Sequence, residues 1–219
     1  MAVRTVRAVL FDFDGVIADS ETLHYQGFEA VARQSLGLTL TRERYDRDLI
    51  GYDDLGAFEL LCAESGVDKT RVAPLADEKK QWLAARLESV PLMAGAREAL
   101  AQCAQCYPWA IVSGALRSEI TTILHAHRLP VPAVIVAAED TAQSKPAPDP
   151  YLRGAHLMGQ APADCLALED TVAGCSSALA AGCRVVQLVA HTTRHAQATR
   201  HIRGHNEMPW AQLDSWLSA

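Results

Sequence analysis

Acidic, hydroxyl and ammonium side chains follow short apolar runs at four points of this sequence. In chain order they are Asp12 with Asp14, Ser113 with Gly114, Lys145, and Glu169 with Asp170. Crowded carboxylates repel one another unless a cation or protons neutralise them. An oxygen-rich donor set with few His or Cys ligands suits magnesium. Magnesium beside a lysine and a hydroxyl makes a set that handles phosphate, and backbone N–H groups at Gly114 and Ala115 can hold phosphate oxygens where a helix begins.

The elements that must position these groups alternate between strand and helix patterns. The apolar, strand-like runs are residues 6–11, 110–112, 133–138, 166–168 and 184–190. They are apolar throughout rather than alternating, which is typical of a parallel sheet covered on both faces. Helical patterns separate them at residues 95–106, 117–127, 148–158 and 171–181. The pattern predicts an α/β fold with a doubly wound, Rossmann-like parallel sheet. In such sheets ligands bind at the carboxyl ends of the strands, so the four polar groups should share one rim.

One stretch interrupts this alternation. Residues 16–90 contain no convincing strand, and the helical patterns there cover 21–36, which ends at Gly37, 55–64 and 76–89. A structureless loop of that length would be improbable inside a compact domain. The sequence therefore predicts a core domain made of residues 1–15 and 91–219, with a helical cap domain at 16–90 inserted after the first strand.

Composition narrows the class of protein. The 219 residues carry 20 basic and 26 acidic side chains, a net charge of −6, and no run of Lys and Arg that would suggest a nucleic-acid partner. The longest apolar runs are too short to cross a membrane. Residues 1–7 are not followed by a secretory apolar segment, so a soluble, cytoplasmic protein is expected. The oligomeric state is not predicted.

With these residues in place, the sequence resembles the haloacid dehalogenase (HAD) superfamily, in the branch with a helical cap after the first strand. That branch contains small-molecule phosphatases and the β-phosphoglucomutase group. The matching motifs are Asp12-Phe13-Asp14-Gly15-Val16, Ser113, Lys145-Pro146, and Glu169-Asp170 with Gly174, and the match covers nearly the whole chain. Singly, each has an ordinary explanation as a turn, a helix cap or a solvated lysine. No such explanation accounts for all four motifs at strand ends in one chain.

The resemblance implies a role for each motif. Asp12 is the nucleophile that forms an aspartyl-phosphate. Asp14 protonates the leaving oxygen and later deprotonates the attacking water. Ser113 donates a hydrogen bond to a phosphoryl oxygen, and Lys145 pairs with Asp12 and the phosphoryl group to offset charge in the transition state.

The resemblance also implies the metal site and a contact from the cap. Mg²⁺ is expected on the Asp12 carboxylate, the Asp14 backbone carbonyl and Asp170, with Glu169 either a direct ligand or a partner of the ligands. His24, one turn into the first cap helix, is expected to contact the substrate or gate the site, with a surface histidine as the alternative.

Other candidate residues have weaker signals. Three basic residues in the last predicted cap helix are expected on a solvated helix face, with the inner face of the cap as the alternative: Lys79, Lys80 and Arg86. Four histidines form two i, i+4 pairs that could hold zinc but are more commonly surface residues: His191, His195, His201 and His205. The Cys103-x-x-Cys106 spacing lacks the second pair that a zinc or redox site would need.

Several functions compete on this scaffold. The leading hypothesis is a magnesium-dependent phosphatase of small phosphorylated metabolites, with sugar phosphates as one class. A β-phosphoglucomutase-type enzyme needs basic residues around a cap glycine to hold a second phosphate, and the stretch Ile50-Gly51-Tyr52-Asp53-Asp54 carries acids there. Val16-Ile17 and His24 nevertheless resemble the mutase pattern, and Lys79 or Lys80 could supply a substitute charge. A 2-haloacid dehalogenase would need neither Asp14 nor a metal. Lysine-based phosphonate cleavage has no positive signal. A receiver-like phospho-switch, which is not an enzyme, would lack the cap.

Overall fold

The computed structural model describes residues 5–49, 52, 54–189 and 193–218, and these form two compact units. One unit comprises Met1–Asp19 and Pro91–Ala219, and the other comprises Ser20–Val90. The chain thus leaves the first unit soon after its first strand and returns to it about 70 residues later.

The first unit is built on a six-stranded parallel sheet with the order β3-β2-β1-β4-β5-β6. The strands are β1 (Ala8–Phe11), β2 (Trp109–Val112), β3 (Ile135–Val136), β4 (Cys165–Glu169), β5 (Arg184–Leu188) and β6 (Arg200–Ile202). Because β1 pairs with both β2 and β4, the strand order reverses beside it. The predicted doubly wound α/β sheet is confirmed.

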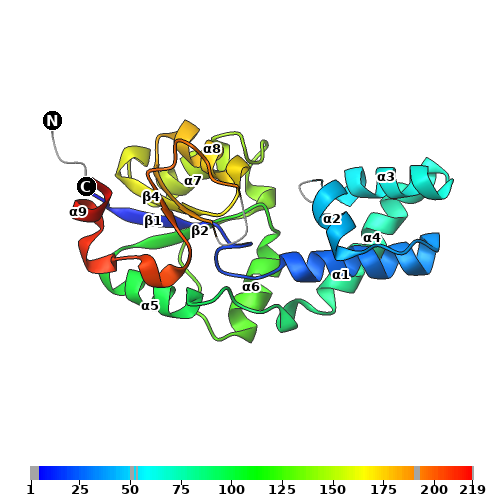
Figure 1. Cartoon of the computed structure of the whole chain (residues 1–219). Helices are drawn as coiled ribbons and strands as arrows, with labels where there is room; N and C mark the ends of the chain where they lie inside the picture. Colours follow the sequence, from blue (N-terminus) through cyan, green and yellow to red (C-terminus); the bar gives the residue numbers. More distant parts are fainter. Residues whose placement is uncertain (1–4, 50–51, 53, 190–192, 219) are drawn as a thin grey trace. The chain divides into compact units, whose positions relative to one another are not determined.

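Helices cover both faces of this sheet. They are α5 (Ala96–Cys106), α6 (Arg117–Ala126), α7 (Asp149–Leu157), α8 (Val172–Ala181) and the C-terminal α9 (Leu213–Ser218). Figure 1 shows α7 and α8 on one face and α5 and α6 on the other. On the α7–α8 face, Leu10 and Val112 of the strands lie in one buried cluster with Tyr151 and Cys175 of the helices. All four residues of β1 are buried, as an apolar run in a two-faced sheet requires.

The strands differ from the sequence-based expectation at one edge and in length. The edge strand β6 was not predicted, because its three residues, Arg-His-Ile, carry no apolar pattern. The strand expected at 133–138 is limited to Ile135–Val136. The strand expected at 184–190 ends at Leu188. Position 190 lies outside the described residues.

Within its described residues, the second unit has only helical elements. These are α1 (Glu21–Val31) with a π-helical turn at Ala32–Leu36, α2 (Arg42–Asp48), α3 (Asp54–Ser65) and α4 (Val72–Ala84). Gly37 ends the first of these with φ +66°, as predicted. The sequence missed α2, whose residues are mostly charged and bury a single side chain, Tyr45. This unit has its own apolar core, which includes Phe28, Phe58 and Leu75.

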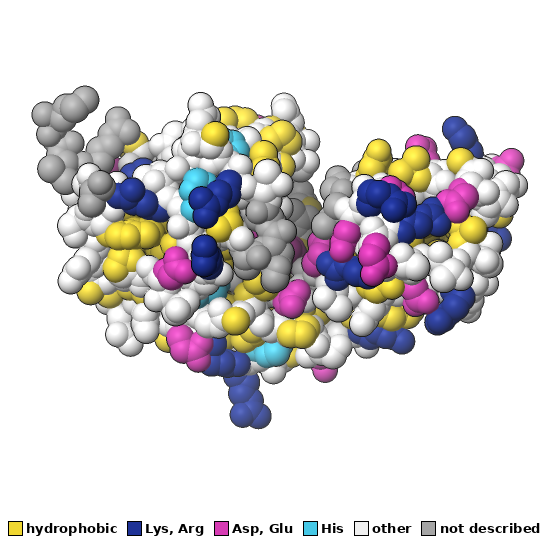
Figure 2. Space-filling view, in the orientation of Figure 1, with side chains coloured by type: hydrophobic (Ala, Val, Ile, Leu, Met, Phe, Trp, Pro, Cys, Tyr) yellow, Lys and Arg dark blue, Asp and Glu magenta, His cyan; other side chains and the backbone are white. Residues whose placement is uncertain are grey.

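Short 3₁₀ turns connect the main elements. They lie at Lys69–Arg71, Leu87–Ser89, Ala138–Asp140, Pro162–Asp164, His205–Glu207 and Trp210–Gln212. On the face shown in Figure 2, acidic and basic side chains are interspersed rather than gathered by sign. Among the described helices, none has both the length and the hydrophobicity needed to span a bilayer. Cys103 and Cys106 are both free thiols, the first buried and the second exposed.

Candidate active site at the carboxyl end of the sheet

Three of the predicted site residues lie at the carboxyl ends of the central strands. The Asp12 N–H donates to the Leu168 carbonyl at 2.9 Å, which continues the β1–β4 ladder by one residue. The Ser113 N–H donates to the Val136 carbonyl at 2.9 Å and extends the β2–β3 ladder in the same way. Glu169 is the final residue of β4. The sheet itself therefore fixes the backbone of these residues where strand order reverses, the place at which such sheets bind ligands.

Lys145 ties these strand ends together. Its ammonium donates to Asp12 Oδ1 at 2.8 Å, to Glu169 Oε1 at 2.6 Å and to the Val112 carbonyl at 3.0 Å. The side chain is 13% exposed, beside carboxylates that are 9% and 0% exposed. Burial opposes its charge, but Asp12 and Glu169 outweigh that effect and raise the pKa of Lys145. The lysine thus stays charged and holds both carboxylates.

Tyr151 is a member of this network that the sequence analysis did not identify. Its hydroxyl, fully buried in α7, donates to Glu169 Oε1 at 2.6 Å. The Thr171 hydroxyl lies 3.4 Å from the other oxygen of Glu169. A Cβ at Gly174 would lie 2.0 Å from Glu169 Oε2, so this glycine is needed for α8 to pass the carboxylate. Glu169 thus has hydrogen-bond partners at both of its carboxylate oxygens.

Ser113 links the end of β2 to the second aspartate. Its hydroxyl accepts from the Ala115 N–H at 2.9 Å and lies 3.4 Å from Asp14 Oδ2. The hydroxyl and Asp14 are thus neighbours, as expected from the strand ends. The Ala115 N–H, expected to hold a phosphate oxygen, is turned toward Ser113 in this structure, while Gly114 is exposed. Phosphate binding at Gly114 and Ala115 stays a prediction.

The electrostatics of the site favour a bound cation. Carboxylate oxygens of Asp12, Glu169 and Asp170 lie within 4.8 Å of one another. Burial and the neighbouring Glu169 raise the pKa of Asp12 well above its usual range, and the same two causes raise the pKa of Asp170 to about 7. One lysine does not offset three carboxylates. An all-oxygen set of this kind fits Mg²⁺ better than it fits a soft metal.

The turn after Asp14 packs directly against this cluster. Gly15 has φ +74°, and a Cβ there would lie 2.2 Å from Asp170 Oδ2. Both the left-handed conformation and the close approach require glycine at this position. Gly15 thereby lets the segment that carries Asp14 reach the strand end that carries Asp170.

Replacing Gly15 with Ala is expected to lower magnesium affinity and activity by about 10–100-fold, the usual effect of disturbing a group that orients a metal ligand. Gly159→Ala is the matched control, because Gly159 has φ +66° but open space around its would-be Cβ. Both variants share the left-handed strain of roughly 1–2 kcal/mol. Magnesium activation curves and melting temperatures separate the two effects. Equal loss of activity in both variants would contradict the assignment of Gly15.

His24 and the three basic residues lie in the second unit. The helix expected at 76–89 ends at Ala84, so Lys79 and Lys80 are in α4 and Arg86 follows it. His24 Nδ1 is 3.1 Å from Lys79 Nζ, and Lys79 forms an ion pair with Asp54 and lies 4.0 Å from the Phe28 ring centroid. The expectation of a solvated Lys79 was wrong, since its side chain is 0% exposed. Lys80 and Arg86 are exposed, as expected. A substrate contact for His24 stays a prediction, and Ile50, Gly51 and Asp53 of the expected cap loop lie outside the described residues.

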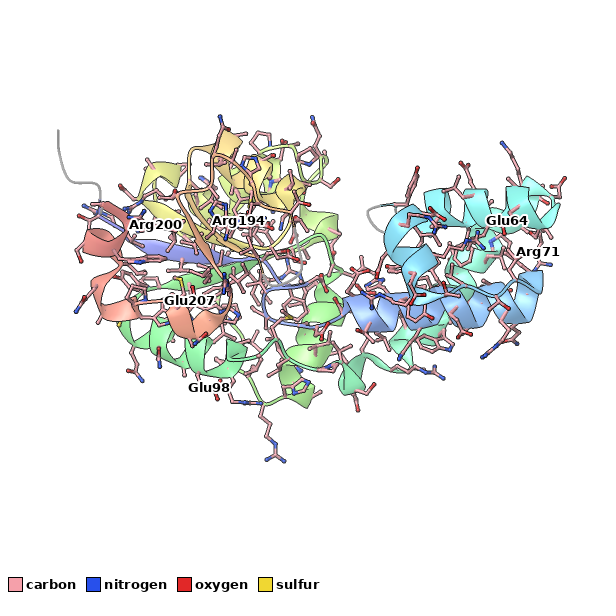
Figure 3. The ribbon with its side chains drawn as sticks, in the orientation of Figure 1. Glu64, Arg71, Glu98, Arg194, Arg200 and Glu207 are labelled. Atoms are coloured by element: carbon pink, nitrogen blue, oxygen red, sulfur yellow. The ribbon has the colours of Figure 1, made fainter. Side chains whose placement is uncertain are left out.

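Three of the four C-terminal histidines lie among the described residues, and each contacts a different partner. His191 lies outside the described residues. His195 contacts the Ser176 hydroxyl, His201 the His195 carbonyl, and His205 the Val16 carbonyl. In Figure 3, Arg194 lies in the connection between β5 and β6, next to His195, and Arg200 begins β6, next to His201. Among the described residues, these three rings do not form a metal-binding group.

Comparison with known proteins decides the family. Residues 6–182 match the haloacid dehalogenase-like hydrolase family. The chain belongs to this family. It is 35% identical over 201 residues to the protein CbbY of Rhodobacter capsulatus, which covers 86% of this chain and 88% of the relative.

Two further comparisons agree with that result. Hexitol phosphatase A of Escherichia coli (strain K12) is 31% identical over 185 residues, covering 84% of this chain and 83% of the phosphatase. The solved structure of a HAD family hydrolase from Deinococcus radiodurans R1, with bound phosphate and sodium, has a TM-score of 0.78 at 26% identity, covering 98% of each chain. This chain is thus a HAD-like phosphatase in the branch with a helical cap.

Proposed function

We propose that this HAD-like phosphatase hydrolyses the phosphate monoester of a small metabolite, a sugar or polyol monophosphate, through an aspartyl-phosphate on Asp12. The observation that carries the proposal is the Lys145 ammonium, which joins Asp12 and Glu169 at the strand reversal. A carboxylate held by an ammonium, next to two further carboxylates, suits attack on an anionic phosphoryl group once the excess negative charge is neutralised.

In the first half-reaction, an oxygen of Asp12 attacks phosphorus and the bond from phosphorus to the leaving oxygen breaks. Asp14 gives its proton to that oxygen, so the product leaves as an alcohol. The Ser113 hydroxyl, which lies 3.4 Å from Asp14, is close enough to donate a hydrogen bond to an oxygen of the same phosphoryl group. Lys145 offsets the charge that develops on the phosphoryl group.

In the second half-reaction, water attacks the same phosphorus and the bond from Asp12 to phosphorus breaks. Asp14, now ionised, takes the proton of that water, so one side chain serves both steps. Asp12 returns as a carboxylate and Lys145 keeps it in place at 2.8 Å. The enzyme is restored with inorganic phosphate as the second product.

The residues present fit a magnesium ion. Carboxylates of Asp12 and Asp170 and the backbone carbonyl of Asp14 would hold it, with Glu169 as a direct ligand or as their partner. The all-oxygen donor set and the raised pKa values of Asp12 and Asp170 support this assignment. When bound, magnesium would supply positive charge to the phosphoryl oxygens.

We also propose the two domains predicted from the sequence, a catalytic core of residues 1–15 and 91–219 and a specificity cap of residues 16–90. His24 of the cap, together with Gly114 and Ala115 of the core, would contact the substrate. His24 is half-buried and is hydrogen bonded to a lysine whose charge Asp54 offsets. The His24 imidazole is therefore better suited to form a hydrogen bond with a neutral hydroxyl of the substrate than to bind a second phosphate.

A phosphatase is favoured over a mutase by the pairing of Lys79. A mutase must hold a bisphosphorylated intermediate through a second cationic site. Lys79 is buried and forms an ion pair with Asp54, so its charge is already offset within the second unit. Asp54 also stands where the sequence analysis expected a mutase to carry a basic residue.

The proposal is tested by incubating the enzyme with β-glucose 1-phosphate, magnesium and a trace of glucose 1,6-bisphosphate. We expect inorganic phosphate to accumulate in step with substrate loss. A parallel panel of hexitol, pentose and triose monophosphates would identify the substrate class by kcat/KM. Rapid formation of glucose 6-phosphate with little free phosphate would show that the enzyme is a mutase.

A further inference from the structure

The turn that follows Asp14 is held by its own backbone and by a second segment of the first unit. The Phe13 carbonyl accepts from Ile17 N–H at 2.7 Å and from Ala18 N–H at 2.9 Å. Ile17 in turn accepts from the Met93 N–H at 2.9 Å. The Val16 carbonyl accepts none of these backbone hydrogen bonds, and its partner comes from the C-terminal part of the chain.

His205 satisfies that carbonyl from 189 residues away in sequence. Its Nε2 lies 2.7 Å from the Val16 oxygen, and the ring is 3% exposed. His205 begins the 3₁₀ turn His205–Glu207, which Figure 3 locates by the label on Glu207. A Cβ at Gly95 would lie 3.3 Å from the Cβ of His205, so this glycine at the start of α5 leaves room for the histidine.

The hydrogen bonds define the state of the ring. A carbonyl only accepts, so Nε2 must carry the proton. Nδ1 is buried and has no hydrogen-bond partner in the structure. Burial also lowers the pKa of His205, which keeps the ring neutral. An unpaired buried nitrogen costs stability, so packing alone would favour an apolar side chain here. The hydrogen bond from Nε2 to the Val16 carbonyl, in the turn that follows Asp14, therefore accounts for a histidine at this position.

We propose that His205 is a positioning residue for Asp14: by holding the Val16 carbonyl, it fixes the turn that sets Asp14 against Ser113 and Gly15 against Asp170. The inference rests on the proposed function, in which Asp14 is the general acid and base. Loss of the bond should let Asp14 drift from the leaving oxygen. Asp12, held by the β1–β4 ladder, and Lys145, held by its bonds to Asp12, Glu169 and the Val112 carbonyl, should stay in place.

Two variants of equal polarity isolate the bond. In His205→Gln, the amide nitrogen reaches about as far as Nε2, so the bond to Val16 is kept. In His205→Asn, the amide reaches only as far as Nδ1, so the bond is lost. Met208→Ala serves as a stability control, because Met208 is a buried apolar residue of the same C-terminal segment. Each variant is assayed as the full-length protein with saturating magnesium.

The readout is the ratio of kcat for an alkyl phosphate, such as a hexitol phosphate, to kcat for p-nitrophenyl phosphate. An alkyl leaving oxygen needs the proton from Asp14, whereas nitrophenolate needs little help. We expect His205→Asn to lower this ratio about tenfold, part of the roughly 10²–10⁴-fold that a general acid contributes. His205→Gln should restore most of the ratio. Met208→Ala should lower the melting temperature and leave the ratio unchanged.

The outcomes separate this inference from the proposed function. If the wild-type enzyme hydrolyses both substrates and His205→Asn slows them equally, His205 is only structural and the inference is wrong. The same conclusion follows if His205→Asn and His205→Gln have the same ratio. If the wild-type enzyme hydrolyses neither substrate, the proposed function fails and this inference fails with it.

Discussion

Replacing Asp12 with Asn is expected to abolish steady-state phosphatase activity while the protein stays folded. An amide oxygen is far less nucleophilic than a carboxylate and cannot form the aspartyl-phosphate. The substitution preserves the shape of the side chain at the end of β1, and Lys145 keeps its bonds to Glu169 and to the Val112 carbonyl. The expected loss is the whole catalysed rate, not a fraction of it.

In the absence of metal, the physical chemistry of Asp12 predicts whether Asp12→Asn raises or lowers the stability of the protein. Burial and the neighbouring carboxylates raise the pKa of Asp12 in the folded state, so its ionised form opposes folding as pH rises above the pKa of the unfolded chain. Removing the charge should therefore leave the melting temperature at pH 7 unchanged or higher. A fall in melting temperature would mean that the carboxylate itself stabilises the strand end.

Asp164→Asn is the matched control for Asp12→Asn. It makes the same chemical change at a partly exposed residue whose ion pair with Arg7, at 3.8 Å, lies outside the carboxylate cluster. Surface changes of this kind usually alter stability by less than about 0.5 kcal/mol. Activity of the control should match the wild type. Genuine turnover by Asp12→Asn, in protein purified free of other phosphatases, would remove Asp12 from the role of nucleophile.

Removal of magnesium is the second change expected to abolish activity. Three carboxylates with oxygens within 4.8 Å and a single ammonium leave the site with excess negative charge, which would repel a phosphate monoester. Chelation should stop turnover, and added Mg²⁺ should restore it. Ca²⁺ should inhibit, because its larger and more flexible coordination sphere would misplace Asp12.

Metal binding also has a readout that does not depend on activity. At a free concentration 100 times its Kd, a ligand that binds only the folded state stabilises it by roughly 2.7 kcal/mol. Mg²⁺ should therefore raise the melting temperature of the wild type, and should do so much less in Asp170→Asn. Full activity after exhaustive chelation, or equal stabilisation of both proteins by Mg²⁺, would contradict a site built on Asp170.

The part of the site that the sequence could predict is the part that strand ends determine. The apolar runs before Asp12, Ser113 and Glu169 indicate buried parallel strands, and parallel strands place their carboxyl ends at one edge. The chemistry of that edge then follows from residue types alone. Lys145 follows no strand end directly, because a loop carries it. Its place in the site follows from charge, since the carboxylates at the strand ends attract its ammonium.

The missed features depend on how helices and loops pack, which short-range patterns do not encode. The contact between Tyr151 and Glu169 is set by the rotation of α7 over the sheet, and Lys79 is buried although its neighbours Glu78 and Lys80 are charged. The spacing of His201 and His205 would bring the rings together only in a helix. The chain there is the strand β6 followed by a 3₁₀ turn, so the two rings bind different partners.

The central claim is that hydrolysis proceeds through a phosphoryl group carried on Asp12. The most direct test is to mix wild-type enzyme with magnesium and a good phosphate monoester substrate, quench in acid within the first turnover, and map the protein by mass spectrometry. The account predicts one phosphoryl group, on the peptide that contains Asp12 and on that residue. A phosphoryl group on another side chain, or release of phosphate in the first turnover from an enzyme that is never phosphorylated, would contradict it.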